Sequence, residues 1–272
     1  GIKIHESSPN ITNVLIANNT ASSDGGGVQV GCYDRVARPN LTNVTIQNNS
    51  ARAGGGMYLG GNYSRSSQPS LNHVLIKSNT ATGSIGGGGI YTTYRSIPTI
   101  TNATICENSA TTGKGGGLYI SANSTMSGIT IFDNTAHGDG GAAYFNQTSG
   151  TYPTITQATI ANNTSATGIN GIFVQSGSPT VSYSNFVNNF TGFYNYDNTA
   201  LASGNNNYWG DISGPYHPSQ NSLGGGDSTN SFVDVTPWLS EPNIEAPPIP
   251  IQDLHVANSG IDFIDLAWDE SP

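Results

Sequence analysis

A pattern of about 30 residues recurs six times along this chain, and a weaker seventh copy follows. The copies begin at Pro9, Pro39, Pro69, Pro98, Thr125, Pro153 and Pro179. Each copy contains two short apolar stretches that alternate with polar residues, as strands with one buried face do, and no helical period appears. Between the stretches lie two asparagines, a small residue and two or three glycines, a composition that bends the chain. One copy cannot bury its own apolar face, so the copies must stack on one another.

Stacking predicts the fold. It places one large apolar residue of each copy in a single interior row, with neighbours about 4.8 Å apart. That row contains Ile16, Ile46, Ile76, Ile105, Ile131, Ile160 and Phe186. The sequence therefore predicts an all-β protein built as a parallel β-solenoid.

Seven asparagines fall in the same register at the corner after the first apolar stretch. They are Asn19, Asn49, Asn79, Asn108, Asn134, Asn163 and Asn189. An amide side chain both donates and accepts hydrogen bonds, so a stacked row can satisfy the backbone groups of the corner and bond to the next coil. We assign these residues a structural role and no catalytic one.

The N-N-x-A-x-x-G-G-G-x-Y pattern resembles the repeat of polymorphic outer-membrane and adhesin-like β-helix proteins. The coils resemble those of right-handed parallel β-helix proteins of the pectate-lyase-like class. The resemblance covers about residues 1–240 and implies a right-handed β-helix of about seven to eight coils, with a C-terminal cap over 204–240 that is similar to the end piece of many secreted bacterial β-helices. This architecture hosts lyases, hydrolases, adhesins and inert stalks, so the resemblance is specific for fold rather than function.

The composition of the chain changes after Trp238. Residues 241–250 are proline-rich and predict a linker, and residues 251–272 resemble the first strands of a fibronectin type III module, with its characteristic Trp268. Such a segment is too short to complete that sandwich. We therefore expect a modular protein that continues further. Because residue 1 already lies within a coil and no signal peptide is present, we also expect a processed or truncated piece.

The charge and hydropathy of the chain limit the classes of protein to which it can belong. Only 9% of the residues are charged and no apolar run is long enough to span a membrane, which favours an extracellular or cell-surface protein. The eight Lys and Arg residues lie within the first 114 positions beside four acids, whereas the remaining chain has thirteen acids and no Lys or Arg. The net charge of -9 disfavours a nucleic-acid partner. The open edges of a solenoid also allow end-to-end self-association.

The two cysteines and five histidines predict neither a disulfide nor a metal site. Cys32 and Cys106 lie three coils apart, about 14 Å along the axis, so we expect no bond between them. No His or Cys pair has ligand spacing, and no cofactor is predicted. Four polar residues of the cap could bind an ion, although turns and cap hydrogen bonds explain them equally well. These are Asp211, His217, Asp227 and Asp234.

Two surface features suggest a binding function. The first is an outward row in the second strand, which we call the Tyr row: Gln29, Tyr58, Tyr91, Tyr119, Tyr144 and Phe173. Its rings either stabilise neighbouring strands or form a flat platform for sugar rings. The second, the Arg-Tyr corner, is made by the loop that follows this strand in each of the first three coils. These loops carry Tyr33, Arg35 and Arg38 in the first coil, Tyr63 and Arg65 in the second, and Tyr94 and Arg95 in the third. Arg either orders the loop by stacking on Tyr or binds carboxylate and sulfate groups of an acidic polysaccharide.

Catalysis requires acids that are adjacent in space. Glu107 and Asp133 occupy equivalent positions in consecutive coils, with Lys77 one coil earlier, and could form the carboxylate pair of a glycosidase. Other copies carry Asn or Ser there, so substitution within a polar corner is the simpler explanation. The resemblance to pectate lyases implies a calcium-binding carboxylate cluster, and no cluster of three acids appears in adjacent coils.

The sequence therefore favours a non-catalytic, adhesin-like rod that binds a polysaccharide or cell-surface glycan along the Tyr row and the Arg-Tyr corner. The alternative is a polysaccharide lyase or glycoside hydrolase that uses Glu107 or Asp133. Further alternatives are a purely structural stalk and an ice-binding protein. The ice-binding alternative rests on the outward threonines Thr45, Thr104, Thr130 and Thr159, a row that Leu15 and Leu75 interrupt.

Overall fold

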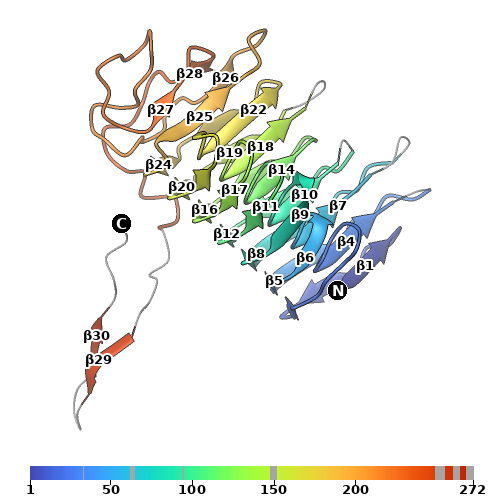
Figure 1. Ribbon diagram of the computed structural model, residues 1–272. Helices are drawn as coiled ribbons and strands as arrows, with labels where there is room; N and C mark the ends of the chain where they lie inside the picture. Colours follow the sequence, from blue (N-terminus) through green and yellow to red (C-terminus); the bar gives the residue numbers. More distant parts are fainter. Residues whose placement is uncertain are drawn as a thin grey trace.

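The computed structural model describes residues 1–32, 34–61, 65–93, 95–147 and 152–248, and the backbone of strands β29 (His255–Ser259) and β30 (Ile264–Ala267). The described residues from Gly1 to Asp234 form a parallel β-helix whose coils stack from the N-terminus to a cap at the opposite end (Figure 1). The described residues contain no helix, and so none with the length and apolar character needed to cross a membrane. The predicted all-β solenoid is confirmed.

Three parallel sheets form the walls of the solenoid. The first sheet contains β1 (Ile2–His5), β4 (Val28–Gly31), β7 (Met57–Leu59), β10 (Ile90–Thr92), β14 (Leu118–Ile120), β18 (Ala143–Asn146), β22 (Ile172–Ser176), β25 (Thr191–Asn195) and β27 (Ser228–Thr229). The second contains β2 (Asn10–Thr12), β3 (Leu15–Ala17), β5 (Asn40–Gln47), β8 (Ser70–Lys77), β11 (Thr99–Thr101), β12 (Thr104–Cys106), β15 (Thr125–Ser127), β16 (Thr130–Phe132), β19 (Thr154–Thr156), β20 (Thr159–Ala161), β23 (Thr180–Ser182), β24 (Asn185–Val187), β26 (Ala202–Ser203) and β28 (Val233–Asp234). The third contains β6 (Ser50–Ala53), β9 (Thr80–Gly86), β13 (Ser109–Ala110), β17 (Thr135–Ala136) and β21 (Thr164–Ser165).

Left-handed backbone residues make the bends of each coil. One set kinks the second sheet and has positive φ at Asn13, Asn43, His73, Asn102, Gly128, Gln157 and Tyr183. Another set forms the corner before the asparagine row, at Asn18, Asn48, Ser78, Glu107, Asp133, Asn162 and Asn188. Asparagine tolerates this conformation better than most residues, which explains why it recurs at both bends. Glycine is required where coils touch, because a Cβ on Gly88 would lie 2.3 Å from the carbonyl oxygen of Gly116.

The predicted interior row is confirmed. Strand pairing aligns Ile16, Ile46, Ile76, Ile105, Ile131, Ile160 and Phe186 in that order, and all seven are buried. At the cap end, Trp209 stacks on Phe186 with ring centroids 4.4 Å apart and is fully buried. The cap therefore closes the apolar core with the largest side chain available.

The asparagine row forms the predicted ladder, and the ladder has a direction. From Asn49 onward, each Oδ1 accepts hydrogen bonds from the backbone N–H and the Nδ2 of the preceding asparagine, at 2.9–3.3 Å. At the cap the last member, Asn189, donates its backbone N–H and its Nδ2 to the carboxylate of Asp227. A carboxylate suits this position because the end of the ladder needs only an acceptor.

The proline-rich segment packs against the outer face of the second sheet. Asn243 and Asn185 form reciprocal hydrogen bonds at 2.7 and 3.1 Å, and Gln157 donates to Glu245. Thr159 donates its hydroxyl to the carbonyl of Pro247. We call residues 243–247 the strap.

The outward threonine row is partly covered, contrary to what an ice-binding surface requires. Thr130 is only 2% exposed and Thr159 is buried beneath the strap. The adjacent outward positions Cys106, Phe132 and Ala161 form a buried apolar cluster. This face of the solenoid is therefore not a free regular array of hydroxyl groups.

Both cysteines are buried, and neither forms a disulfide. The Cys32 thiol donates to the carbonyl of Arg65 at 3.3 Å. Burial raises the pKa of the Cys106 thiol to about 12. Near the C-terminal end, β29 and β30 pair in antiparallel fashion. Trp268, which suggested a fibronectin-like module, lies outside the described residues.

Candidate carbohydrate-binding surface

The Tyr row lies on the outer face of the first sheet in the predicted register. Strand pairing aligns Gln29, Tyr58, Tyr91, Tyr119, Tyr144, Phe173 and Tyr194 in successive coils. Consecutive rings lie 4.8–5.9 Å apart between centroids, from Tyr58 to Tyr194. The solenoid therefore places one aromatic ring on each of six successive coils, because the coil repeat fixes the separation of the rings.

The row is less exposed than an open platform would be. Tyr58, Tyr91 and Tyr119 are half-buried, whereas Tyr144 is only 2% exposed and Phe173 is also buried. Tyr144 is covered because Lys114 lies 4.6 Å over its ring and donates to its hydroxyl, which in turn donates to Gln175. The expectation of an exposed ring is therefore wrong at Tyr144 and Phe173, and the accessible stretch runs from Tyr58 to Tyr119.

One cationic side chain, Arg52, lies beside the accessible stretch. Arg52 projects from β6 beside Tyr58 and Tyr91, and its guanidinium contacts the carboxylate of Asp24 at 3.2 Å. The hydrogen bond to this carboxylate raises the pKa of Arg52. Burial raises the pKa of Tyr58 and raises that of Tyr91 to about 12, so both hydroxyls remain protonated near neutral pH. This part of the surface offers half-buried aromatic rings and phenol hydroxyls beside the ion pair of Arg52 and Asp24.

The arginines of the Arg-Tyr corner have local partners. Arg38 donates its Nε to Gln68 of the next coil at 2.9 Å, and Arg65 donates its Nε to the backbone carbonyl of Asp34 at 3.1 Å. Both side chains are exposed, as is Arg35, whereas Arg95 is partly buried. The corner tyrosines Tyr33, Tyr63 and Tyr94 lie outside the described residues. The hydrogen bonds to Gln68 and Asp34 are those expected of arginines that order a loop.

The two acids considered for catalysis occupy the left-handed corner. Glu107 and Asp133 have φ of 56° and 54° and belong to the same row as Asn48 and Ser78. The carboxylate of Glu107 contacts the Nζ of Lys77 at 2.9 Å and accepts from the hydroxyl of Ser78 at 2.9 Å. Both of its oxygens are thus engaged by the preceding coil, which accounts for this acid without a catalytic role.

The polar residues of the cap make turns and cap contacts. Asp211 accepts from Ser213 and Asp234 accepts from Thr236, each two residues along the chain. His217 is buried and bonded to backbone groups of Val233 and Gln220. Among the described residues no group of three or more His, Cys, Asp or Glu side chains is arranged to hold a metal ion.

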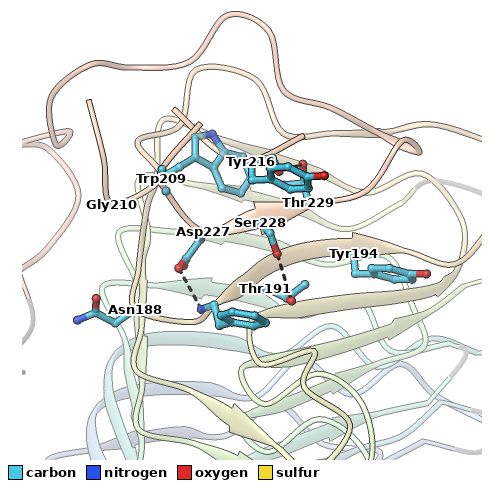
Figure 2. Close-up of a pocket in the computed structure, with 12 residues that line it drawn as sticks. Asn188, Thr191, Tyr194, Trp209, Gly210, Tyr216, Asp227, Ser228 and Thr229 are labelled. Atoms are coloured by element: carbon cyan, nitrogen blue, oxygen red, sulfur yellow. Dashed lines mark hydrogen bonds between the residues drawn. The ribbon is translucent and has the colours of Figure 1, made fainter. Parts of the chain in front are cut away.

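Sequence reasoning missed a pocket where the cap meets the last coil. Its volume is about 770 Å³, and it is lined by side chains from β25, β27 and the cap loops (Figure 2). The available signal was Phe190, which follows the ladder residue Asn189 at a position where the other copies carry Thr or Ser. Tyr194, the last ring of the Tyr row, also lines this pocket.

The model of the right-handed β-helix region family matches residues 1–152 and 32–208, and so covers most of the chain. The chain belongs to this family. Neither a curated protein nor a solved structure matches it. The family match, together with the parallel stacked coils, establishes a right-handed β-helix of about eight turns and does not distinguish rod-like adhesins from enzymes on the same fold.

Proposed function

We propose that this β-helix is a non-catalytic, adhesin-like rod of a cell-surface or secreted protein that binds an acidic polysaccharide along the Tyr row. The observation that carries the proposal is the accessible stretch from Tyr58 to Tyr119, in which half-buried rings in consecutive coils lie beside Arg52. A polymer that repeats along the rod axis would meet the same aromatic contact at each coil.

The charge distribution supports an acidic ligand. Two of the three accessible rings, Tyr58 and Tyr91, lie within the first 114 residues, where eight Lys and Arg residues accompany four acids. The exposed guanidinium groups of Arg35, Arg38 and Arg65 add cations at a neighbouring corner of the same coils. Planar guanidinium groups bind carboxylates and sulfates with two parallel hydrogen bonds, and aromatic faces pack on the apolar faces of sugars.

A purely structural role for the rings makes a different prediction. If the rings serve only to stabilise adjacent strands, the loss of one ring costs a few tenths of a kcal/mol for each ring pair that it breaks and changes no binding property. If they bind polymer, Tyr91→Ala weakens binding far more than it weakens the fold. Tyr183→Asn is a matched control, because it removes an exposed tyrosine from the second sheet and places an asparagine where φ is already positive.

The test is affinity electrophoresis of the full chain through gels cast with neutral, uronic-acid or sulfated polysaccharides. We expect retardation by the anionic polymers, loss of retardation in Tyr91→Ala and reduced retardation in Arg65→Ala, with Tyr183→Asn unchanged. Equal retardation of Tyr91→Ala and the wild type would show that the Tyr row is not the site. Staining the gels for polymer also tests the enzyme alternative, because a cleared track that disappears in Glu107→Gln or Asp133→Asn would identify a lyase or hydrolase.

A further inference from the structure

The pocket between the cap and the last coil is built differently from the rest of the surface. The aromatic residues Phe190, Tyr194, Tyr216 and Trp209 line it. Figure 2 shows Tyr194, Trp209 and Tyr216 at this site. The hydroxyls of Ser228 and Thr191 face each other across the neighbouring strands at 3.3 Å. A volume of about 770 Å³ lies within the usual range for small-ligand sites.

Phe190 is the least expected residue of this pocket. It has a φ of 65°, which is unfavourable for a bulky side chain, and it is 78% exposed, so burial of its ring does not offset that strain. Asp227 accepts from its backbone N–H, and Ser228 donates to its carbonyl at 2.8 Å, which together hold the strained backbone. Backbone strain of this kind clusters at functional sites. Tyr183 is also left-handed and exposed, but only Phe190 of the two lines this pocket.

The chemistry of the lining selects a class of ligand. Exposed rings and hydroxyls suit a molecule that has apolar faces and a rim of hydroxyl groups, which describes a pyranose sugar. None of the lining residues is Lys, Arg or His, and the chain contains no Lys or Arg after Lys114. A buried carboxylate, Asp227, lies in the wall. An anionic ligand would therefore meet no cation here, in contrast to the N-terminal part of the rod.

We propose that the cap pocket is a second binding site, which takes the end of a neutral oligosaccharide between Phe190, Tyr194 and Tyr216. Hydroxyls of the sugar bond to Ser228 and Thr191, and its faces pack on the rings. This site is separate from the polymer-binding surface, although Tyr194 continues the Tyr row into the pocket.

The test is isothermal titration calorimetry of the full chain with a panel of neutral hexasaccharides built from glucose, galactose, mannose or xylose. The informative variant is Phe190→Asn, because asparagine occupies the left-handed positions of other coils without difficulty. We expect at least one hexasaccharide to bind, and Phe190→Asn to weaken that binding about tenfold or more while its Tm stays equal or rises. Leu223→Ala, which removes an exposed apolar side chain of the cap outside the pocket, should leave binding unchanged.

Three results would overturn the proposal: no binding by any member of the panel, equal affinities for the wild type and Phe190→Asn, or loss of hexasaccharide binding in Tyr91→Ala. The last result would assign the sugar to the Tyr row. The two proposals fail separately, because Tyr91→Ala tests retardation by anionic polymers and Phe190→Asn tests the neutral oligosaccharide.

Discussion

Asp227 should be the most sensitive single residue at the cap end of the ladder. Its two oxygens accept from three donors, the backbone N–H and Nδ2 of Asn189 and the backbone N–H of Phe190, at 2.8–3.1 Å. Asp227→Ala removes all of these acceptors at once. Each buried N–H that loses its partner costs about 1 kcal/mol or more, so we expect a loss of about 3 kcal/mol in the free energy of unfolding.

The same geometry ranks other substitutions. Asp227→Asn keeps one oxygen and turns an NH2 group toward donors, so we expect a loss of about 1 kcal/mol, partly offset because a buried charge is removed. Asn108→Asp makes the converse change in mid-ladder, where the Nδ2 of Asn108 donates to Ile76 and Asn134 at 2.9 and 3.0 Å. A carboxylate cannot donate, so two acceptors would face a buried charge. We expect this change to cost on the order of 3–5 kcal/mol.

Urea unfolding followed by far-ultraviolet circular dichroism measures these differences. With an m-value of about 3 kcal/mol/M for a chain of this size, the midpoint of Asp227→Ala should fall by about 1 M. Amide hydrogen exchange should also accelerate first at Asn189 and Phe190, because a cap can open locally before the coils do. An unchanged midpoint for Asp227→Ala, or a smaller loss for Asn108→Asp than for Asp227→Asn, would refute the view that the ladder is directional.

Three further outcomes can be checked. Burial raises the pKa of Asp227, so the folded state binds the proton more tightly than the unfolded state does. Stability should therefore fall as the pH rises from the pKa of the unfolded state through that of the folded state. Urea midpoints measured over a pH series should show this fall in the wild type and less of it in Asp227→Asn. The thiol of Cys106, with a pKa of about 12, should react with Ellman's reagent at pH 8 only after denaturant is added, and rapid reaction in the native state would contradict its burial. Asn185→Ala removes two hydrogen bonds to Asn243, so limited proteolysis should cut the strap faster than in the wild type, and an unchanged rate would mean that these bonds do not hold it.

The sequence was sufficient for features that depend on the repeat. The interior row, the asparagine ladder and the register of the Tyr row follow from a constant period, because stacked coils place equivalent residues next to one another. The sequence was not sufficient to predict which side chains of the Tyr row are exposed. Tyr144 and Tyr91 occupy equivalent positions, but only Tyr144 lies under Lys114, whose side chain bonds to its hydroxyl from 30 residues away.

Contacts from outside the repeat could not be predicted in the same way. The strap reaches Thr159 across 88 residues of sequence, and Asp227 reaches Asn189 across 38. The strap and Asp227 do not belong to any copy of the pattern, so the register of the repeat does not predict which residues they contact. The sequence did suggest that the polar cap residues make turns and cap hydrogen bonds, which the contacts of Asp211 and Asp234 confirm, but it did not identify which residue ends the ladder.

A solenoid repeats one chemical environment at every coil, which suits a ligand that is itself repetitive. A discrete pocket instead requires a place where one copy departs from the repeated pattern. In this chain the seventh copy departs from the pattern: Phe190 replaces the usual Thr or Ser, and Asn189 donates to the carboxylate of Asp227 instead of to another asparagine. Asp227 serves both purposes there, because the oxygens that end the ladder also hold the backbone of Phe190. Asp227→Ala should therefore weaken the fold and hexasaccharide binding together, whereas Phe190→Asn should separate them, losing the ligand while the ladder stays intact.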